Sequence, residues 1–60
     1  MTNVSFRMKD GSVIGVRIQY LEARDIESKL GSPGYVFSVS HGAVRHTIRA
    51  ADVEGMSIFN

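Results

Sequence analysis

Hydrophobic and polar residues alternate along most of this chain, and the alternation is interrupted once near the middle. The period of two runs from Val4 to Lys9 and returns from Ile14 to Tyr20. Alternation of this kind is typical of a strand with one buried face. The sequence therefore predicts a β-hairpin at the start of the chain.

The length of the loop in this hairpin follows from parity. A two-residue loop would put the two hydrophobic rows on opposite faces. A three-residue loop at 9–11 pairs Phe6 with Ile14 and keeps both rows on one face. The next inward pair is then Val4 with Val16. A type I turn followed by a left-handed glycine is a common loop of this length, so we expect it here.

The period changes at Leu21, where hydrophobic residues begin to recur at helical spacing. Ala23, Ile26 and Leu30 share one face, and charged residues occupy the other side. Pro33 prevents the helix from continuing. The sequence predicts a helix from Leu21 to Leu30.

Alternation returns after the helix and predicts a second hairpin. Its strands begin at Tyr35 and Val44, and a two-residue turn at 41–42 keeps their hydrophobic rows on one face. This turn pairs Val39 with Val44, Phe37 with His46 and Tyr35 with Ile48. A tight helical turn at 50–53 and a short last strand that includes Met56, Ile58 and Phe59 complete the chain.

The predicted fold class is α+β, with one helix packed on one face of a small antiparallel sheet of about five strands, in the order ββαβββ. The sheet is expected either to stay open or to curl into a small barrel. We expect a single domain over 1–60. A chain of this size buries only about 60% of the surface exposed on unfolding, and without cysteine no disulfide supplements the core. Self-association is the remaining common supplement, so a homo-oligomer is expected.

The distribution of charge is more informative than its sum. Seven basic and six acidic residues give a net charge of only +1, which favours no class of partner. Five basic side chains, however, fall at outward positions of the predicted sheet, where no strand position is acidic. They are Arg7, Lys9, Arg17, Arg45 and Arg49.

Such a face predicts a small non-enzymatic binding protein for a phosphate-bearing ligand, either nucleic acid or a nucleotide, because arginine contacts phosphate through two parallel hydrogen bonds. The competing interpretation is a merely solvated outer face. The aromatic residues expected to point inward are Phe6, Tyr20, Tyr35 and Phe37. The outer face therefore lacks a stacking platform for single strands, although contact with a duplex backbone needs none.

The sequence offers little for metal binding or catalysis. His41 and His46 are the only histidines and no cysteine accompanies them, so neither a metal site nor a cofactor is expected. The glycines around Pro33 follow the helix end, where the dipole repels anions. No nucleophile elbow or inward acid–base pair is present. We therefore expect a protein that is not an enzyme.

Surplus hydrophobic residues support the alternative that the chain binds a protein. Val13 and Val36 fall on the outer face by parity, and Phe59 has no evident place inside. They suit a homodimer, a closed ring, or a protein-binding inhibitor or adaptor such as small phage or mobile-element proteins that act on a host protein. The longest hydrophobic runs are far shorter than a membrane span, so no membrane partner and a cytoplasmic location are expected.

Overall fold

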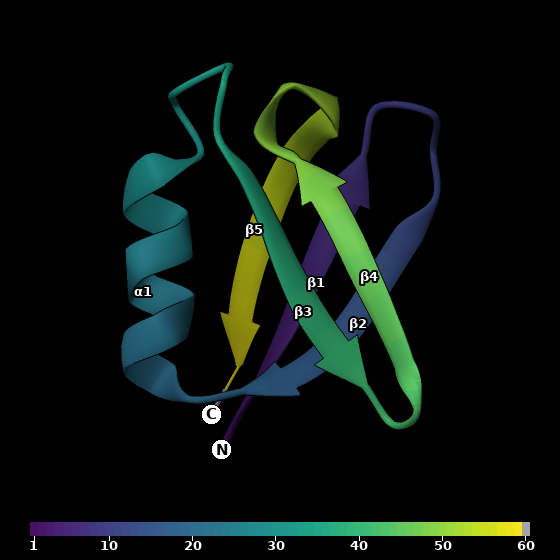
Figure 1. Cartoon of the computed structure of the whole chain (residues 1–60), viewed down its shortest axis with the longest axis vertical. Coiled ribbons are helices and arrows are strands. Elements are labelled where there is room, and N and C mark those ends of the chain that lie inside the picture. Colours follow the sequence, from purple (N-terminus) through teal and green to yellow (C-terminus); the bar gives the residue numbers. More distant parts are fainter. Residues whose placement is uncertain (60) are drawn as a thin grey trace.

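The computed structural model describes residues 1–59, and its elements follow the predicted order ββαβββ (Figure 1). The strands are β1 (Thr2–Met8), β2 (Val13–Ile18), β3 (Val36–His41), β4 (Val44–Arg49) and β5 (Val53–Phe59). The helix α1 (Tyr20–Lys29) lies between β2 and β3, and a 3₁₀ turn, η1 (Ala50–Asp52), connects β4 to β5. The predicted helix, the tight turn and the last strand are thus confirmed, although β5 begins earlier than expected.

The strands form two antiparallel sheets, so the prediction of a single sheet was wrong. The first sheet has the order β2-β1-β5, and the second pairs β3 with β4. The inward rows of the two sheets face each other across one core, where the ring centroids of Phe6 in β1 and Phe37 in β3 are 5.4 Å apart. Within residues 1–59 the sheets are not closed into a barrel.

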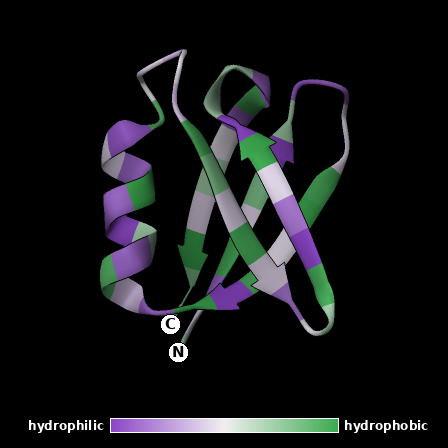
Figure 2. Ribbon diagram, in the orientation of Figure 1, coloured by the Kyte–Doolittle hydropathy of each residue, from purple (hydrophilic) through white to green (hydrophobic). Residues whose placement is uncertain are grey.

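The helix closes one side of the space between the two sheets (Figure 1). Most of its surface is hydrophilic, with hydrophobic residues interspersed (Figure 2). Ala23 and Ile26 are buried and enter the shared core. Because α1 carries the chain from one layer to the other, β3 starts opposite the first sheet rather than beside it. The core consists of Val4, Phe6, Val16, Ile18, Ala23, Ile26, Phe37, Val39 and Ile48.

The first hairpin has the predicted register. Phe6 lies opposite Ile14 and Val4 opposite Val16. Gly11 has a φ of 94°, as the left-handed end of a three-residue loop requires. Parity was sufficient here because only one short loop kept both hydrophobic rows inside.

The second hairpin has a different register from the one predicted. His41 lies opposite Val44 and Val39 opposite His46, so the turn falls at 42–43. The predicted turn needed a positive φ at His41, whereas the observed turn needs it only at Gly42, where φ is 62°. A slip of two residues leaves the same side chains facing inward, which is why alternation alone could not detect it.

Candidate functional site

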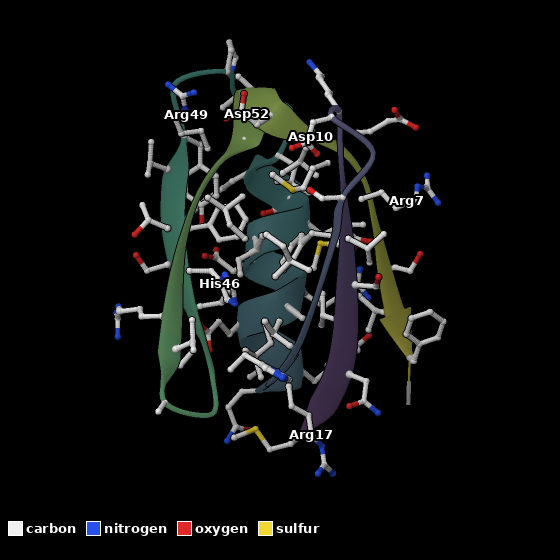
Figure 3. The ribbon with its side chains drawn as sticks, turned by 90° about the vertical axis from the view of Figure 1, so that its right-hand side faces the viewer. Arg7, Asp10, Arg17, His46, Arg49 and Asp52 are labelled. Atoms are coloured by element: carbon white, nitrogen blue, oxygen red, sulfur yellow. The ribbon has the colours of Figure 1, made fainter. Side chains whose placement is uncertain are left out.

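The five basic residues predicted to share one face lie in three places. Side chains alternate along a strand, so the outer rows of two sheets that face each other point in opposite directions. Arg7 and Arg17 lie on the outside of the first sheet, whereas Arg49 lies on the outside of the second (Figure 3). Arg45, four residues before Arg49 in β4, shares its outer face. Lys9 lies in the turn between β1 and β2. A single continuous basic face is therefore absent from residues 1–59.

Ion pairs neutralise three of the seven basic side chains. Arg49 contacts Asp52 at 3.1 Å, Lys29 contacts Asp25 at 3.1 Å, and Arg24 contacts Glu27 at 3.2 Å. In residues 1–59 the four others, Arg7, Lys9, Arg17 and Arg45, make neither an ion pair nor a side-chain hydrogen bond. Unpaired guanidinium groups keep their donors available for an anion.

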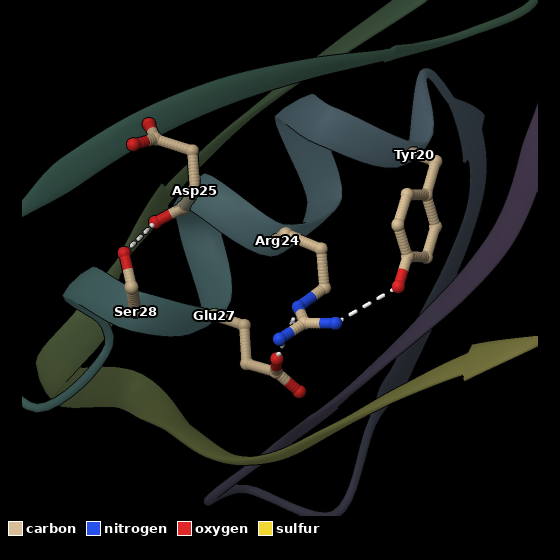
Figure 4. Close-up of polar contacts among 5 residues, drawn as sticks. All are labelled: Tyr20, Arg24, Asp25, Glu27 and Ser28. Atoms are coloured by element: carbon tan, nitrogen blue, oxygen red, sulfur yellow. Dashed lines mark hydrogen bonds and ion pairs between the residues drawn. The ribbon is translucent and has the colours of Figure 1, made fainter.

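The two paired cations on the surface of α1 contact side chains of the same helix. Arg24 Nη1 donates to Tyr20 Oη at 2.8 Å, while its Nε faces Glu27 (Figure 4). The hydrogen bond to Tyr20, followed by the charges of Tyr20 and Glu27, holds the pKa of Arg24 above its usual value. The hydrogen bond to Asp25 likewise raises the pKa of Lys29. These two cations stabilise the helix and are not free for a ligand.

Arg17 and Arg45 border the same surface hollow although they belong to different sheets. The end of β2 lies beside β3, so the two arginines line one hollow of about 280 Å³ at the start of α1. We call it the arginine hollow. Its polar lining consists of Arg17, Gln19, Glu22, Ser38, Ser40 and Arg45. Two guanidinium groups and two hydroxyl groups can donate hydrogen bonds to the oxygens of a phosphate, and Glu22 is the one acid that opposes it.

A second hollow lies on the outside of the first sheet and shares Arg17 with the arginine hollow. Its volume is about 330 Å³. We call it the sheet hollow. The residues that line it are Asn3, Val4, Ser5, Gly15, Val16, Arg17, His41 and Phe59. Its floor is shallow because Ser5 lies opposite Gly15, and little side-chain volume rises above the sheet there.

Phe59 lies on the outer surface, as expected of a residue with no evident place inside, so the prediction that the outer face lacks aromatic rings was wrong. It lies opposite Asn3, which lies opposite Arg17, so these three residues form one outward row across the sheet. Its residue surface is 54% exposed. Tyr20, which was expected to point inward, is exposed at the start of α1. The alternation in β5 already predicts this position, because Met56 and Ile58 point inward and the next residue, Phe59, must then point outward.

A third hollow, of about 600 Å³, has a different character. Met8, Lys9, Asp10, Ser12, Ile14 and Asp52 line it. Asp10 accepts hydrogen bonds from the Ser12 hydroxyl at 2.6 Å and the Ser12 N–H at 2.9 Å, and these bonds lower the pKa of its carboxyl. This carboxylate stabilises the turn and repels anions. Lys9 thus lines a different hollow from the two arginines.

The histidines do not assemble a metal site in the described part of the chain. His46 is half-buried opposite Val39, not opposite Phe37 as predicted, and it lies between the sheets on the side away from α1 (Figure 3). His41 lines the sheet hollow. No three histidine or carboxylate side chains of residues 1–59 are grouped as metal ligands would be.

Nor is any helix within residues 1–59 of the length and hydrophobicity that a membrane crossing requires. Comparison with protein-family models, with curated proteins and with solved structures finds no significant match to this chain.

Proposed function

We propose that this chain is a small non-enzymatic binding protein that holds a phosphate-bearing ligand between Arg17 and Arg45. The observation that carries the proposal is that these two unpaired arginines, from different sheets, line one hollow. Arginine binds phosphate through a planar fork of donors, and two such forks can contact one phosphate from two sides. Ser38 and Ser40 add hydroxyl donors at the same hollow.

The start of α1 supports the same ligand chemistry. Gln19 precedes the helix without a side-chain capping bond, so the first backbone N–H groups point out of the helix unpaired by that side chain. The positive end of the helix dipole therefore lies beside the arginine hollow and adds to its attraction for an anion. Glu22 weakens this attraction, which favours a ligand with more than one negative charge.

Titration with inorganic pyrophosphate, followed by calorimetry, tests the proposal. A charge-assisted hydrogen bond contributes about 1.5–3 kcal/mol, so Arg17→Gln and Arg45→Gln are each expected to weaken binding roughly 10- to 150-fold. Arg49→Gln is the matched control for Arg45→Gln, because it removes the same charge from the same outer face of β4. Equal losses from Arg45→Gln and Arg49→Gln would contradict the proposed site.

A further inference from the structure

We infer that the phosphate belongs to single-stranded nucleic acid, and that one of its bases stacks on Phe59 in the sheet hollow. This inference rests on the proposed function, because it needs the arginine hollow to hold a phosphate. Arg17 lines both hollows, so a ligand can contact one guanidinium while extending from the arginine hollow onto the outside of the first sheet.

The aromatic ring is the first argument. The ring pairs of the described residues join Phe6, Tyr35 and Phe37, and none of them includes Phe59. Phe59 is 54% exposed and lines the sheet hollow. A base has a flat apolar face, and proteins that bind single strands use exposed aromatic rings on a sheet as platforms for it.

The spacing within the outward row is the second argument. Arg17 and Phe59 lie on either side of Asn3 in adjacent strands, so their Cα atoms are separated by two strand spacings, roughly 10 Å. A charged donor and a ring at this separation can contact the phosphate and the base of one nucleotide unit. Asn3, between them, can hydrogen-bond the edge of a base with its amide.

The open surface beside Phe59 is the third argument. A Cβ added at Gly15 would meet no atom within 4 Å, so space lies free above the sheet. At the far end of the same face, Arg7 pairs with Gly55 of β5, and its side chain lies over that glycine. It provides a third unpaired guanidinium group. The outside of the first sheet thus carries an exposed aromatic ring at Phe59, an open area at Gly15 and the two unpaired arginines Arg7 and Arg17.

These features favour a single strand over a free nucleotide or a duplex. Sites for small molecules enclose most of the ligand surface, whereas both hollows here lie on the outer surface, and exposed residues such as Phe59 form part of their lining. The bases of a duplex are stacked on one another and present no free face to Phe59. A single strand supplies unstacked bases and several phosphates together.

Two variants test the base contact without touching the arginines. Phe59→Leu removes the ring, and Gly15→Val fills the sheet hollow with a side chain that suits a strand. The probe is fluorescein-labelled decathymidylate, and its affinity is measured by fluorescence anisotropy. Loss of one stacked base is expected to weaken binding roughly 5- to 150-fold. Phe59→Tyr, which keeps the ring, is expected to bind as the parent protein does.

Pyrophosphate titration of the same variants separates this inference from the proposed function. We expect Phe59→Leu and Gly15→Val to bind pyrophosphate as the parent chain does, while an abasic strand of equal length binds that chain more weakly than decathymidylate. If both variants keep full affinity for decathymidylate, the base contact is refuted and the phosphate site stands. Equal affinity for thymidine monophosphate or for duplex DNA would refute the single strand as ligand.

Discussion

The contact between Phe6 and Phe37 provides a quantitative test of the two-sheet arrangement. Phe6 is fully buried, and its ring meets that of Phe37 at 5.4 Å with an interplanar angle of 47°. The two rings come from different sheets, so their contact depends on how the sheets pack and not on strand pairing. Replacing Phe6 with leucine removes the ring and leaves a branched hydrocarbon in its place.

The expected loss has two parts. Truncation of a buried phenylalanine to alanine costs about 3–5 kcal/mol, and leucine retains most of that volume, so the packing loss is about 1 kcal/mol. The aromatic pair itself contributes about 0.5–1.5 kcal/mol. We therefore expect Phe6→Leu to lower the free energy of unfolding by about 2 kcal/mol. A chain of 60 residues has a total of about 3–9 kcal/mol, so this variant is expected to remain folded.

Urea denaturation followed by circular dichroism measures the change. With a slope of about 1 kcal/mol per molar urea, Phe6→Leu should move the midpoint by about 2 M. A double-mutant cycle with Phe37→Leu should return a coupling of about 0.5–1.5 kcal/mol. Val13→Ala, at a position 60% exposed, is the control and should change little. A coupling under about 0.3 kcal/mol, as for distant residues, would refute the packing of the two sheets.

Three further predictions concern the turns and the arginine hollow. Gly42→Ala should cost about 1–2 kcal/mol of stability, because the residue at the start of this turn has positive φ; Gly34→Ala, with ordinary φ and open space around it, should cost less than about 0.5 kcal/mol in the same urea titration. Ser12→Ala removes the hydroxyl hydrogen bond to Asp10 and keeps the backbone one, so it should raise the pKa of Asp10 part of the way toward 3.8 in an NMR titration. Both bonds lower this pKa in the folded chain, so they stabilise the fold above about pH 3.8, and this stabilisation is lost as the carboxyl protonates in acid. An unchanged pKa in the variant would show that the hydroxyl bond does not lower it. Glu22→Gln should tighten pyrophosphate binding by roughly 2- to 5-fold, because it removes the one acidic side chain that lines the arginine hollow. Unchanged affinity would show that the charge of Glu22 does not repel the ligand.

The two hairpins show what alternation can and cannot determine. In the first, one short loop kept Phe6 and Ile14 on the same face, so the register followed from the sequence. In the second, two registers differing by two residues gave identical faces, and the backbone preference of Gly42 decided between them. The backbone conformation of the turn was therefore the stronger constraint. Because glycine adopts positive φ more readily than histidine, this preference alone would have identified the observed register.

The layers were harder to predict than the strands. Alternation assigns a side chain to the inside or the outside, but it does not say whether two inward rows lie beside each other or face to face. The helix connection decides this, and its path depends on how Ala23 and Ile26 pack. The predicted basic residues were consequently divided between the two sheets. Only the three-dimensional arrangement shows that Arg17 and Arg45 line the same hollow.

The pairing of Asn3 with Phe59 joins the first strand of the chain to the last. The hairpin of β1 and β2 closes a short loop, whereas docking of β5 closes nearly the whole chain, and the entropy of closure grows with loop length. We therefore expect β5 to dock late in folding and to detach early in unfolding. A ligand that contacts both Arg17 and Phe59 would connect β2 to β5 and so hold β5 in place. Saturating ligand should therefore slow the detachment of β5 more than the opening of the other strands. This effect adds to the rise in the free energy of unfolding that the concentration and affinity of the ligand determine.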